Sequence, residues 1–202
     1  MSATIIDKAY EDNANLRRYL SERNELSLLR TVEDSFRKTL VLSAASLFEH
    51  LITDAIHGYC ERKNGADTCV LALVRIKVIK RQYFTYFDWE ARRAGPFFGL
   101  LGEQIGEKLK AESKVEPLKS SLEAFLELGF LRNSLVHQNF AGYAFEKTNE
   151  EVYALYQKAS IFVSRIIEEL TPNEPSGSTH AASTPVDESI PAIPDEAPPP
   201  ST

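Results

Sequence analysis

The sequence contains little cysteine and no long hydrophobic run. Cys60 and Cys69 are the only cysteines among 202 residues, too few for a disulfide framework, which favours a reducing cytoplasmic environment. No uninterrupted apolar run reaches the roughly 18 residues that a membrane helix needs. The N-terminus is acidic and lacks the basic-then-apolar layout of a secretion signal. We therefore expect a soluble cytoplasmic protein without a membrane partner.

Several catalytic signatures are also missing. The sequence has no Gly-rich phosphate loop, no Ser-His-Asp set and no metal-carboxylate motif, so kinase, hydrolase and dehydrogenase functions have no support. The candidate zinc ligands are His50, His57, Cys60 and Cys69. Their spacing, His-x6-His-x2-Cys-x8-Cys, matches no common zinc layout. We expect neither a metal nor a cofactor.

Proline is nearly confined to the C-terminus. Residues 171–202 hold eight of the ten prolines, five of the 29 acidic residues and no lysine or arginine. Such a segment cannot bury enough apolar surface to offset its ordering entropy, so we predict a disordered tail, either a tether or a segment without a role. The remaining 24 acidic and 23 basic residues leave a nearly neutral body, which neither indicates nor excludes a nucleic-acid partner.

The body of the chain has helical periodicity nearly throughout, with apolar residues recurring every three to four positions. The expected helices span residues 5–23, 31–63, 67–81, 100–112, 117–138 and 148–170. The valine and isoleucine content of the third leaves a strand as an alternative, and Gly95-Pro96 is expected to interrupt the chain. We predict an all-α, up-and-down bundle of about five to six helices over residues 31–170, with residues 1–30 forming an N-terminal helix that packs on the bundle or extends it.

The stretch FLRNSLVHQNF, residues 130–140, places polar side chains at the end of an apolar helix. Phe130, Asn133 and His137 share one row of the helix, whereas Arg132 continues the neighbouring row after Gly129. Asn133 and His137 can therefore share a face. Arg132 and His137 lie about 140° apart around an ideal helix. The long arginine side chain, an unwound last turn or a dimer would have to bring these two groups together.

Two interpretations fit this arrangement. In the structural one, His137 caps the helix C-terminus, where a cation is favoured, and Arg132 pairs with a carboxylate. In the functional one, the two side chains converge on a phosphate. Histidine can exchange a proton near neutral pH, and arginine binds phosphate oxygens bidentately. RNA cleavage by the 2′-oxygen of the RNA itself needs only such groups and no metal.

Charged residues elsewhere are further candidates. Glu49 lies on the second expected helix and could orient Arg132 or His137, or be a partly exposed acid. Basic residues around the aromatic-rich segment could contact RNA phosphates beside stacking platforms, or form a solvated face. The candidates for RNA binding are Lys80, Arg81, Arg92 and Arg93. We expect most of the aromatic residues in this segment to be core.

The chain resembles the HEPN superfamily. Arg132-Asn133-x-x-x-His137 has the form of the motif Arg-Asn-x-x-x-His that is commonest there. The stretches SAASLFEHLITDAI (43–56) and IKRQYFTYFDWEARRAGPFFGLLG (79–102), followed by the motif and a closing helix, are similar in order to the RiboL-PSP-HEPN branch over about residues 35–170. The resemblance implies a dimeric bundle whose motifs face a shared cleft, with Arg132 and His137 catalytic and Asn133 positioning His137 or the phosphate.

The resemblance also implies a function. Many members of the family are metal-independent endoribonucleases of toxin or phage-defence type that cleave single-stranded RNA through 2′-hydroxyl attack. RNA would be the substrate, the protein would act as a homodimer, and an antitoxin or defence-system protein would be its partner. Other members keep the fold but bind a nucleotide, RNA or a protein. A catalytically silent module therefore remains an alternative, as does a purely structural helical adaptor.

Overall fold

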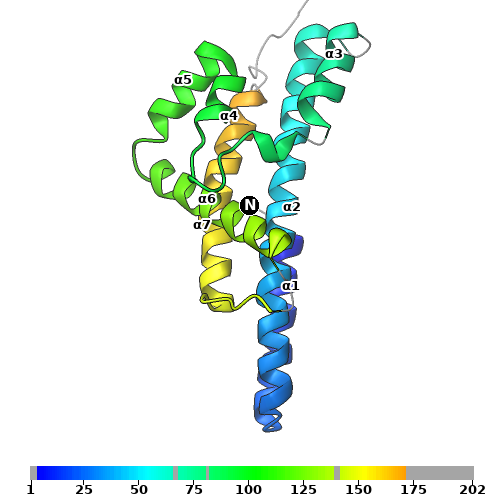
Figure 1. The fold of residues 1–202 in the computed structure, drawn as a ribbon, viewed down its shortest axis with the longest axis vertical. Coiled ribbons are helices and arrows are strands. Elements are labelled where there is room, and N and C mark those ends of the chain that lie inside the picture. Colours follow the sequence, from blue (N-terminus) through cyan, green and yellow to red (C-terminus); the bar gives the residue numbers. More distant parts are fainter. Residues whose placement is uncertain (1–3, 66–67, 81, 139–141, 172–202) are drawn as a thin grey trace, which may run out of the picture. The chain divides into compact units, whose positions relative to one another are not determined.

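The computed structural model describes residues 4–65, 68–80, 82–138 and 142–171 (Figure 1). These residues form α-helices and two short helices of other types, η1 and η2, and no strand. The α-helices are α1 (Ile5–Glu22), α2 (Leu26–Asn64), α3 (Cys69–Leu73), α4 (Gly95–Leu100), α5 (Gly102–Glu112), α6 (Leu118–His137) and α7 (Asn149–Leu170). The π-helix η1 spans Val74–Ile79, and the 3-10 helix η2 spans Tyr83–Thr85. The all-α prediction is confirmed, and the short helix α4, which has no counterpart among the six expected helices, brings the described number of α-helices to seven. The tail predicted to be disordered lies outside the described residues from position 172 onward.

Helices α2, α6 and α7 pack against one another around an aromatic core (Figure 1). Phe125 of α6 is its centre, because the Phe125 ring lies 5.8 Å from Phe48 of α2 and 5.3 Å from Phe162 of α7. Phe87, which precedes α4, meets the same ring edge-on at 4.9 Å. Buried aromatic rings favour such offset and edge-to-face contacts. The aromatic-rich segment of residues 83–98 is therefore part of the core, as predicted for most of its rings.

Helix α1 runs along α2 and is fastened to α7 (Figure 1). Thr4 and Asp7 form a capping box at its start, which satisfies backbone N–H groups that have no partner inside the helix. The Asp7 carboxylate also accepts a hydrogen bond from the Tyr153 hydroxyl at 2.8 Å. The Tyr10 ring stacks on the Tyr153 ring with centroids 3.9 Å apart. These contacts make α1 part of the bundle.

Helix α2 begins earlier than predicted. It starts at Leu26 rather than at 31, because the chain reverses in a tight turn whose Glu25 N–H donates to the Leu20 carbonyl at 2.9 Å. Asn24 has φ 58 in this turn, a conformation that asparagine tolerates better than most residues. The Thr31 hydroxyl donates to a carbonyl inside the helix rather than capping a new one. The expected end near residue 63 is confirmed, because α2 ends at Asn64 and Gly65 follows it with φ 81.

Two further local predictions need correction. The strand alternative for residues 67–81 is wrong, because the chain forms α3 and then η1 beside the end of α2. The Thr68 side chain caps α3 by accepting a hydrogen bond from the Leu71 N–H at 3.1 Å, and this local cap offsets the strand preference of the valines and isoleucines. Gly95-Pro96 begins α4 rather than interrupting the chain. Proline suits the first turn of a helix, where its missing N–H would have no partner.

One helix in the described ranges, α2, is long and apolar enough to cross a membrane by length and composition alone, with a mean hydropathy of 1.3 over its most apolar window. In the bundle this helix contributes the buried residues Val41, Phe48 and Ile52 to the core. Packing against α6 and α7 therefore accounts for the hydrophobicity of this face of α2.

Ion pairs hold α5 against α7. Arg165 of α7 donates from Nε and Nη2 to the Glu112 carboxylate at 2.8 and 3.1 Å. The same guanidinium binds Glu169, which also accepts hydrogen bonds from Lys108 of α5. Bidentate arginine–carboxylate contacts are the strongest form of surface ion pair. They join the C-terminal part of α5 to the last turns of α7.

Gly129 of α6 allows the aromatic segment to approach this helix closely. A Cβ atom on Gly129 would lie 1.9 Å from the Trp89 ring. Trp89 is only 7% exposed, and its indole N–H donates to the Phe84 carbonyl at 3.0 Å. Beyond Trp89 the chain turns back through two backbone hydrogen bonds between Asp88 and Arg93, both 2.9 Å. The missing side chain at 129 thus determines where the residues on both sides of Trp89 lie.

We expect Gly129→Ala to lower the free energy of unfolding by about 1–3 kcal/mol, because an added methyl group overpacks this contact. Gly99→Ala is the matched control, since Gly99 is also helical but has no atom within 4 Å of the added Cβ. We expect that control to be neutral or stabilising by up to about 1 kcal/mol. Urea unfolding followed by circular dichroism measures both. Equal unfolding midpoints for the two variants would contradict the close contact of Trp89 with Gly129.

Candidate functional site

Arg132, Asn133 and His137 lie in the last turns of α6. The helix remains regular to its end, where the Gln138 N–H donates to the Ser134 carbonyl at 3.0 Å. Asn133 and His137 are one turn apart on one face. Arg132 and His137 are separated by about 140° around the axis and about 7.5 Å along it. The last turn does not unwind, so the helix directs Arg132 and His137 to different sides.

The Arg132 guanidinium lies over an aromatic ring. Its Cζ atom is 3.7 Å from the centroid of Phe84, which follows Tyr83 in η2. A guanidinium over a ring face is held by cation–π attraction. Within the part of the chain that the structure describes, the guanidinium makes no hydrogen bond and no ion pair. No described residue therefore occupies its N–H donors, of which an arginine side chain has five.

Glu49 of α2 balances the charge of Arg132 without pairing with it directly. Burial raises the pKa of Glu49, and the positive charge of Arg132 acts in the opposite direction. Burial lowers the pKa of Arg132, and Glu49 and Tyr83 counteract this. The Tyr83 phenol is buried near both groups, and its burial, followed by the charge of Glu49, raises its pKa far above the ordinary range. An arginine remains charged in such surroundings, so the site presents a partly buried cation.

Packed rings close the inner side of Arg132. The hollow behind it, lined by Phe48, Trp89 and Phe125 among others, has about 10 Å³ of space. That is roughly the volume needed for one water molecule. A phosphate is much larger, so it would reach the guanidinium only from the outer side of the bundle.

His137 is exposed at the end of α6. In residues 4–65, 68–80, 82–138 and 142–171 it has no hydrogen-bond or ion-pair partner. The C-terminal end of a helix favours a cation, which is consistent with the capping interpretation as well as with a site. No described group of the same chain orients the imidazole.

The turn after Trp89 places two of the candidate basic residues near α6. The guanidinium of Arg92 lies over the Phe130 ring, 4.5 Å from its centroid. Phe130 belongs to the same row of α6 as Asn133 and His137. Arg93 is exposed, and its backbone closes the turn with Asp88. Of this pair, Arg92 has the defined contact with the motif helix.

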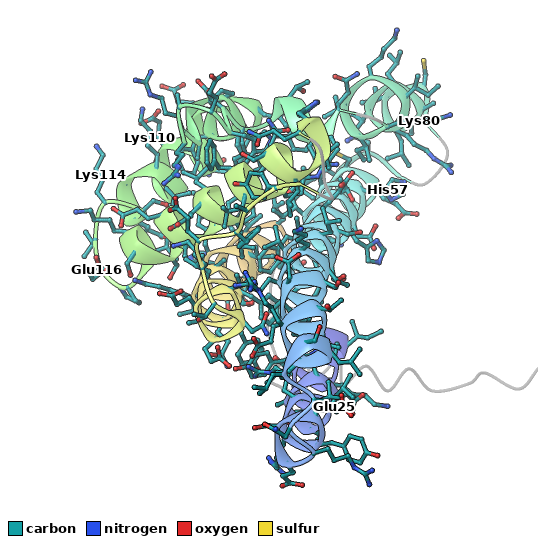
Figure 2. All side chains as sticks on the ribbon, turned by 60° about the horizontal axis from the view of Figure 1, so that its bottom comes forward. Glu25, His57, Lys80, Lys110, Lys114 and Glu116 are labelled. Carbon is teal, nitrogen blue, oxygen red and sulfur yellow. The ribbon has the colours of Figure 1, made fainter. Side chains whose placement is uncertain are left out.

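The other two basic candidates are not placed at the motif. Lys80 follows η1 and lines a surface hollow of about 540 Å³ together with His57 and Arg75. Figure 2 shows Lys80 on the lobe that η1 adds near the end of α2, and His57 on α2 itself. Arg81 lies outside the described residues.

No group of three or more histidine, cysteine or acidic side chains in the described ranges could hold a metal ion. His50 lies 3.3 Å from Asp54. His57 lies 3.9 Å from Glu61. Both cysteines are free, Cys60 partly buried and Cys69 exposed. The side chains considered as zinc ligands therefore do not form a cluster.

The sequence did not indicate that arginine side chains would lie over the rings of Phe84 and Phe130. Both occur in aromatic or apolar stretches, and nothing in the local pattern separates a ring under a guanidinium from a ring inside the core. Gly129 was the available signal, because a glycine within an apolar helix row often marks a close approach by another part of the chain.

Replacing Glu49 by glutamine tests the electrostatics of this site. Between the ordinary pKa of a glutamate and the raised pKa of Glu49, the folded chain binds more protons than the unfolded chain. The carboxyl group therefore makes the free energy of unfolding fall as the pH rises through that window. We expect Glu49→Gln to remove this fall and to be at least as stable as the wild type at neutral pH.

Urea unfolding of both proteins between about pH 4 and 7 measures the effect. Subtracting the two curves of unfolding free energy against pH cancels the contributions of the other carboxyl groups. Glu123→Gln is the matched control, because it removes an exposed carboxylate from α6. If Glu49→Gln were less stable than the wild type at neutral pH and equally stable at the acidic end, the carboxylate would instead be a stabilising partner of Arg132.

Comparison with known protein families shows which family the chain belongs to. The family model described as RiboL-PSP-HEPN matches residues 8–172. No curated protein and no solved structure matches the chain. The matched region starts within α1 and continues through α7, so it includes the N-terminal helix as well as Glu49, Arg132 and His137. Because this match covers most of the sequence, the protein is a member of the RiboL-PSP-HEPN family.

Proposed function

We propose that the protein is a metal-independent endoribonuclease that cleaves single-stranded RNA. Membership of a HEPN family supports an RNA-related or nuclease-like module in general. The observation that carries the specific proposal is Arg132, whose guanidinium is supported by Phe84 and balanced by Glu49 but has no hydrogen-bond or ion-pair partner in the described chain. A charged, partly desolvated arginine with unused donors is suited to binding a phosphate.

The proposed reaction needs only a proton carrier and a phosphate-binding group. His137 takes the proton from a ribose 2′-hydroxyl, and the 2′-oxygen attacks the adjacent phosphorus. The bond from phosphorus to the 5′-oxygen breaks, and that oxygen receives a proton from the imidazolium. The products are a 2′,3′-cyclic phosphate and a 5′-hydroxyl. Arg132 stabilises the charge that develops on the non-bridging oxygens, and Asn133 positions His137 or the phosphate.

A homodimer is part of this proposal. A regular α6 directs Arg132 and His137 of one chain to different sides, which favours a site assembled from two protomers. In a two-fold symmetric dimer, Arg132 of one protomer and His137 of its partner would form each of two equivalent sites. The cellular role we propose is that of a toxin or phage-defence nuclease in the cytoplasm, controlled by an antitoxin or defence-system protein.

We expect His137→Ala to lower kcat for cleavage of single-stranded RNA by about 10²- to 10⁴-fold, the usual contribution of a general acid or base. The fold should be unaffected, because His137 is exposed. Gln138→Ala, which changes the exposed side chain next to it, is the matched control. Cleavage is measured on labelled RNA with EDTA present. Equal rates for His137→Ala and wild type would rule out the proposed role of His137.

The second candidate function is a catalytically silent module that binds RNA, a nucleotide or a partner protein. The observation that favours it is the lack of any described group that orients His137. RNA binding without cleavage by the wild-type protein, with EDTA or with added divalent metal ions, would establish this module in place of the nuclease.

Mixing two inactive variants tests whether the site is shared between protomers. Arg132→Ala and His137→Ala homodimers each lack one group at both sites. A mixed dimer would have one site with both wild-type residues and one site with neither. Random pairing of equal amounts should therefore restore about a quarter of the wild-type activity. Absence of any recovery, in mixtures shown to exchange subunits, would place both residues of each site within one chain.

A further inference from the structure

Helix α6 and the aromatic segment hold two arginines by reciprocal contacts. Phe84 of the segment lies under Arg132 of α6, at 3.7 Å. Phe130 of α6 lies under Arg92 of the segment, at 4.5 Å. Trp89 lies between Phe84 and Arg92 in the segment, and Gly129, which it contacts, directly precedes Phe130 on α6. Each element thus supplies the ring that positions the arginine of the other.

The backbone at Arg92 is held in an unusual conformation. Arg92 has φ 52, in the left-handed region that residues other than glycine and asparagine rarely adopt. The turn around it is closed by the backbone pair of Asp88 and Arg93, and the Asp88 carboxylate accepts a hydrogen bond from the Ala91 N–H at 3.0 Å. Strained residues in such a conformation tend to cluster at functional sites. A loop that served only to reverse the chain would favour glycine here.

The position of Arg92 relates it to the motif. Phe130, Asn133 and His137 share one row of α6, and Phe130 precedes His137 by about two turns, roughly 10 Å along the axis. Arg92 therefore lies against the face of α6 that carries His137, about two turns nearer the start of the helix. Arg132 lies on the neighbouring row. The two guanidinium groups flank the same stretch of helix from different rows.

Arg92 is also available to an anion. It is exposed, and no carboxylate of the described residues pairs with it. A guanidinium over a ring keeps its planar N–H donors at the edge, where they bind two oxygens of a phosphate. Arg92 lies on the side of α6 that carries His137, so in the shared site proposed above Arg92 of one protomer and Arg132 of its partner would contact one strand at different phosphates.

We propose that Arg92 binds a phosphate next to the scissile one, so that the site takes a single strand of several nucleotides and not a mononucleotide. This inference rests on the proposed function, because Arg132 and His137 mark the scissile phosphate. A mononucleotide would engage Arg132 alone. A strand engages both arginines, and its affinity gains from the second contact.

Binding of a labelled oligonucleotide with a 2′-O-methyl backbone, which cannot be cleaved by 2′-attack, tests the proposal. Fluorescence anisotropy gives its affinity over a range of salt concentrations. The variant is Arg92→Asn, because asparagine tolerates the left-handed conformation and so preserves the turn. Loss of one phosphate contact should reduce the slope of log affinity against log salt by about 0.7 for a single strand. The affinity of the wild type for a ribonucleoside monophosphate should be unchanged in the variant.

Two further variants separate the contact from its alternatives. Arg18→Ala removes an exposed arginine of α1 and controls for the general loss of charge. Phe130→Leu keeps the charge of Arg92 but removes the ring beneath it, and should weaken strand binding in the same direction as Arg92→Asn. Equal effects of Arg92→Asn and Arg18→Ala would overturn the proposal.

The outcomes also distinguish this proposal from the proposed nuclease. If Arg132→Ala reduces the salt slope and Arg92→Asn does not, Arg92 is not a phosphate contact and the nuclease proposal stands. If Arg92→Asn reduces the slope but the wild type cleaves no RNA, the strand-binding role stands and the nuclease proposal fails. If the wild type does not bind the oligonucleotide, both are overturned.

Discussion

The contact between the Trp89 ring and the bare backbone of Gly129 is the constraint on which the site depends. A methyl group at 129 would occupy the space of the indole. Because that space is free, the segment contacts α6 at Phe84, Phe87, Trp89 and Arg92. The attachment brings Phe87 against Phe125 in the core and Phe84 under Arg132. One missing side chain thus couples the hydrophobic core to the position of the arginine in the motif.

Two partly buried arginines in this protein show how structural and binding roles differ. Arg165 is saturated by carboxylates, since Glu112 accepts two hydrogen bonds and Glu169 another. Those hydrogen bonds raise the pKa of Arg165, and the side chain fastens α5 to α7. Arg132 has a ring beneath it and Glu49 nearby, but no hydrogen-bond or ion-pair partner in the described ranges, and burial lowers its pKa. Leaving donors of a partly buried cation unused is costly unless a ligand satisfies them.

Much of the fold was predictable because helices depend on local chemistry. The limits of α6 and the capping box at Thr148 follow from residues three or four positions apart. The errors also have local causes. Leu26 begins α2 because a tight turn at Asn24 leaves no room for the longer loop that was expected. Gly95-Pro96 can either interrupt the chain or form the first turn of a helix. The packing of Phe97 and Phe98 into the core favours the first turn.

By itself, the sequence determined the all-α class, most helix limits and the presence of Arg132, Asn133 and His137 at one helix end, because these follow from periodicity and spacing along a single element. It also indicated the family. Only the tertiary structure decided which aromatic rings lie under arginines and which fill the core. Phe84 and Arg132 are distant in the sequence, and the contact of Trp89 with Gly129 brings their two segments together. The structure also showed that α6 stays helical to His137. A regular helix keeps residues five positions apart on different sides, so α6 of one chain directs Arg132 and His137 away from each other.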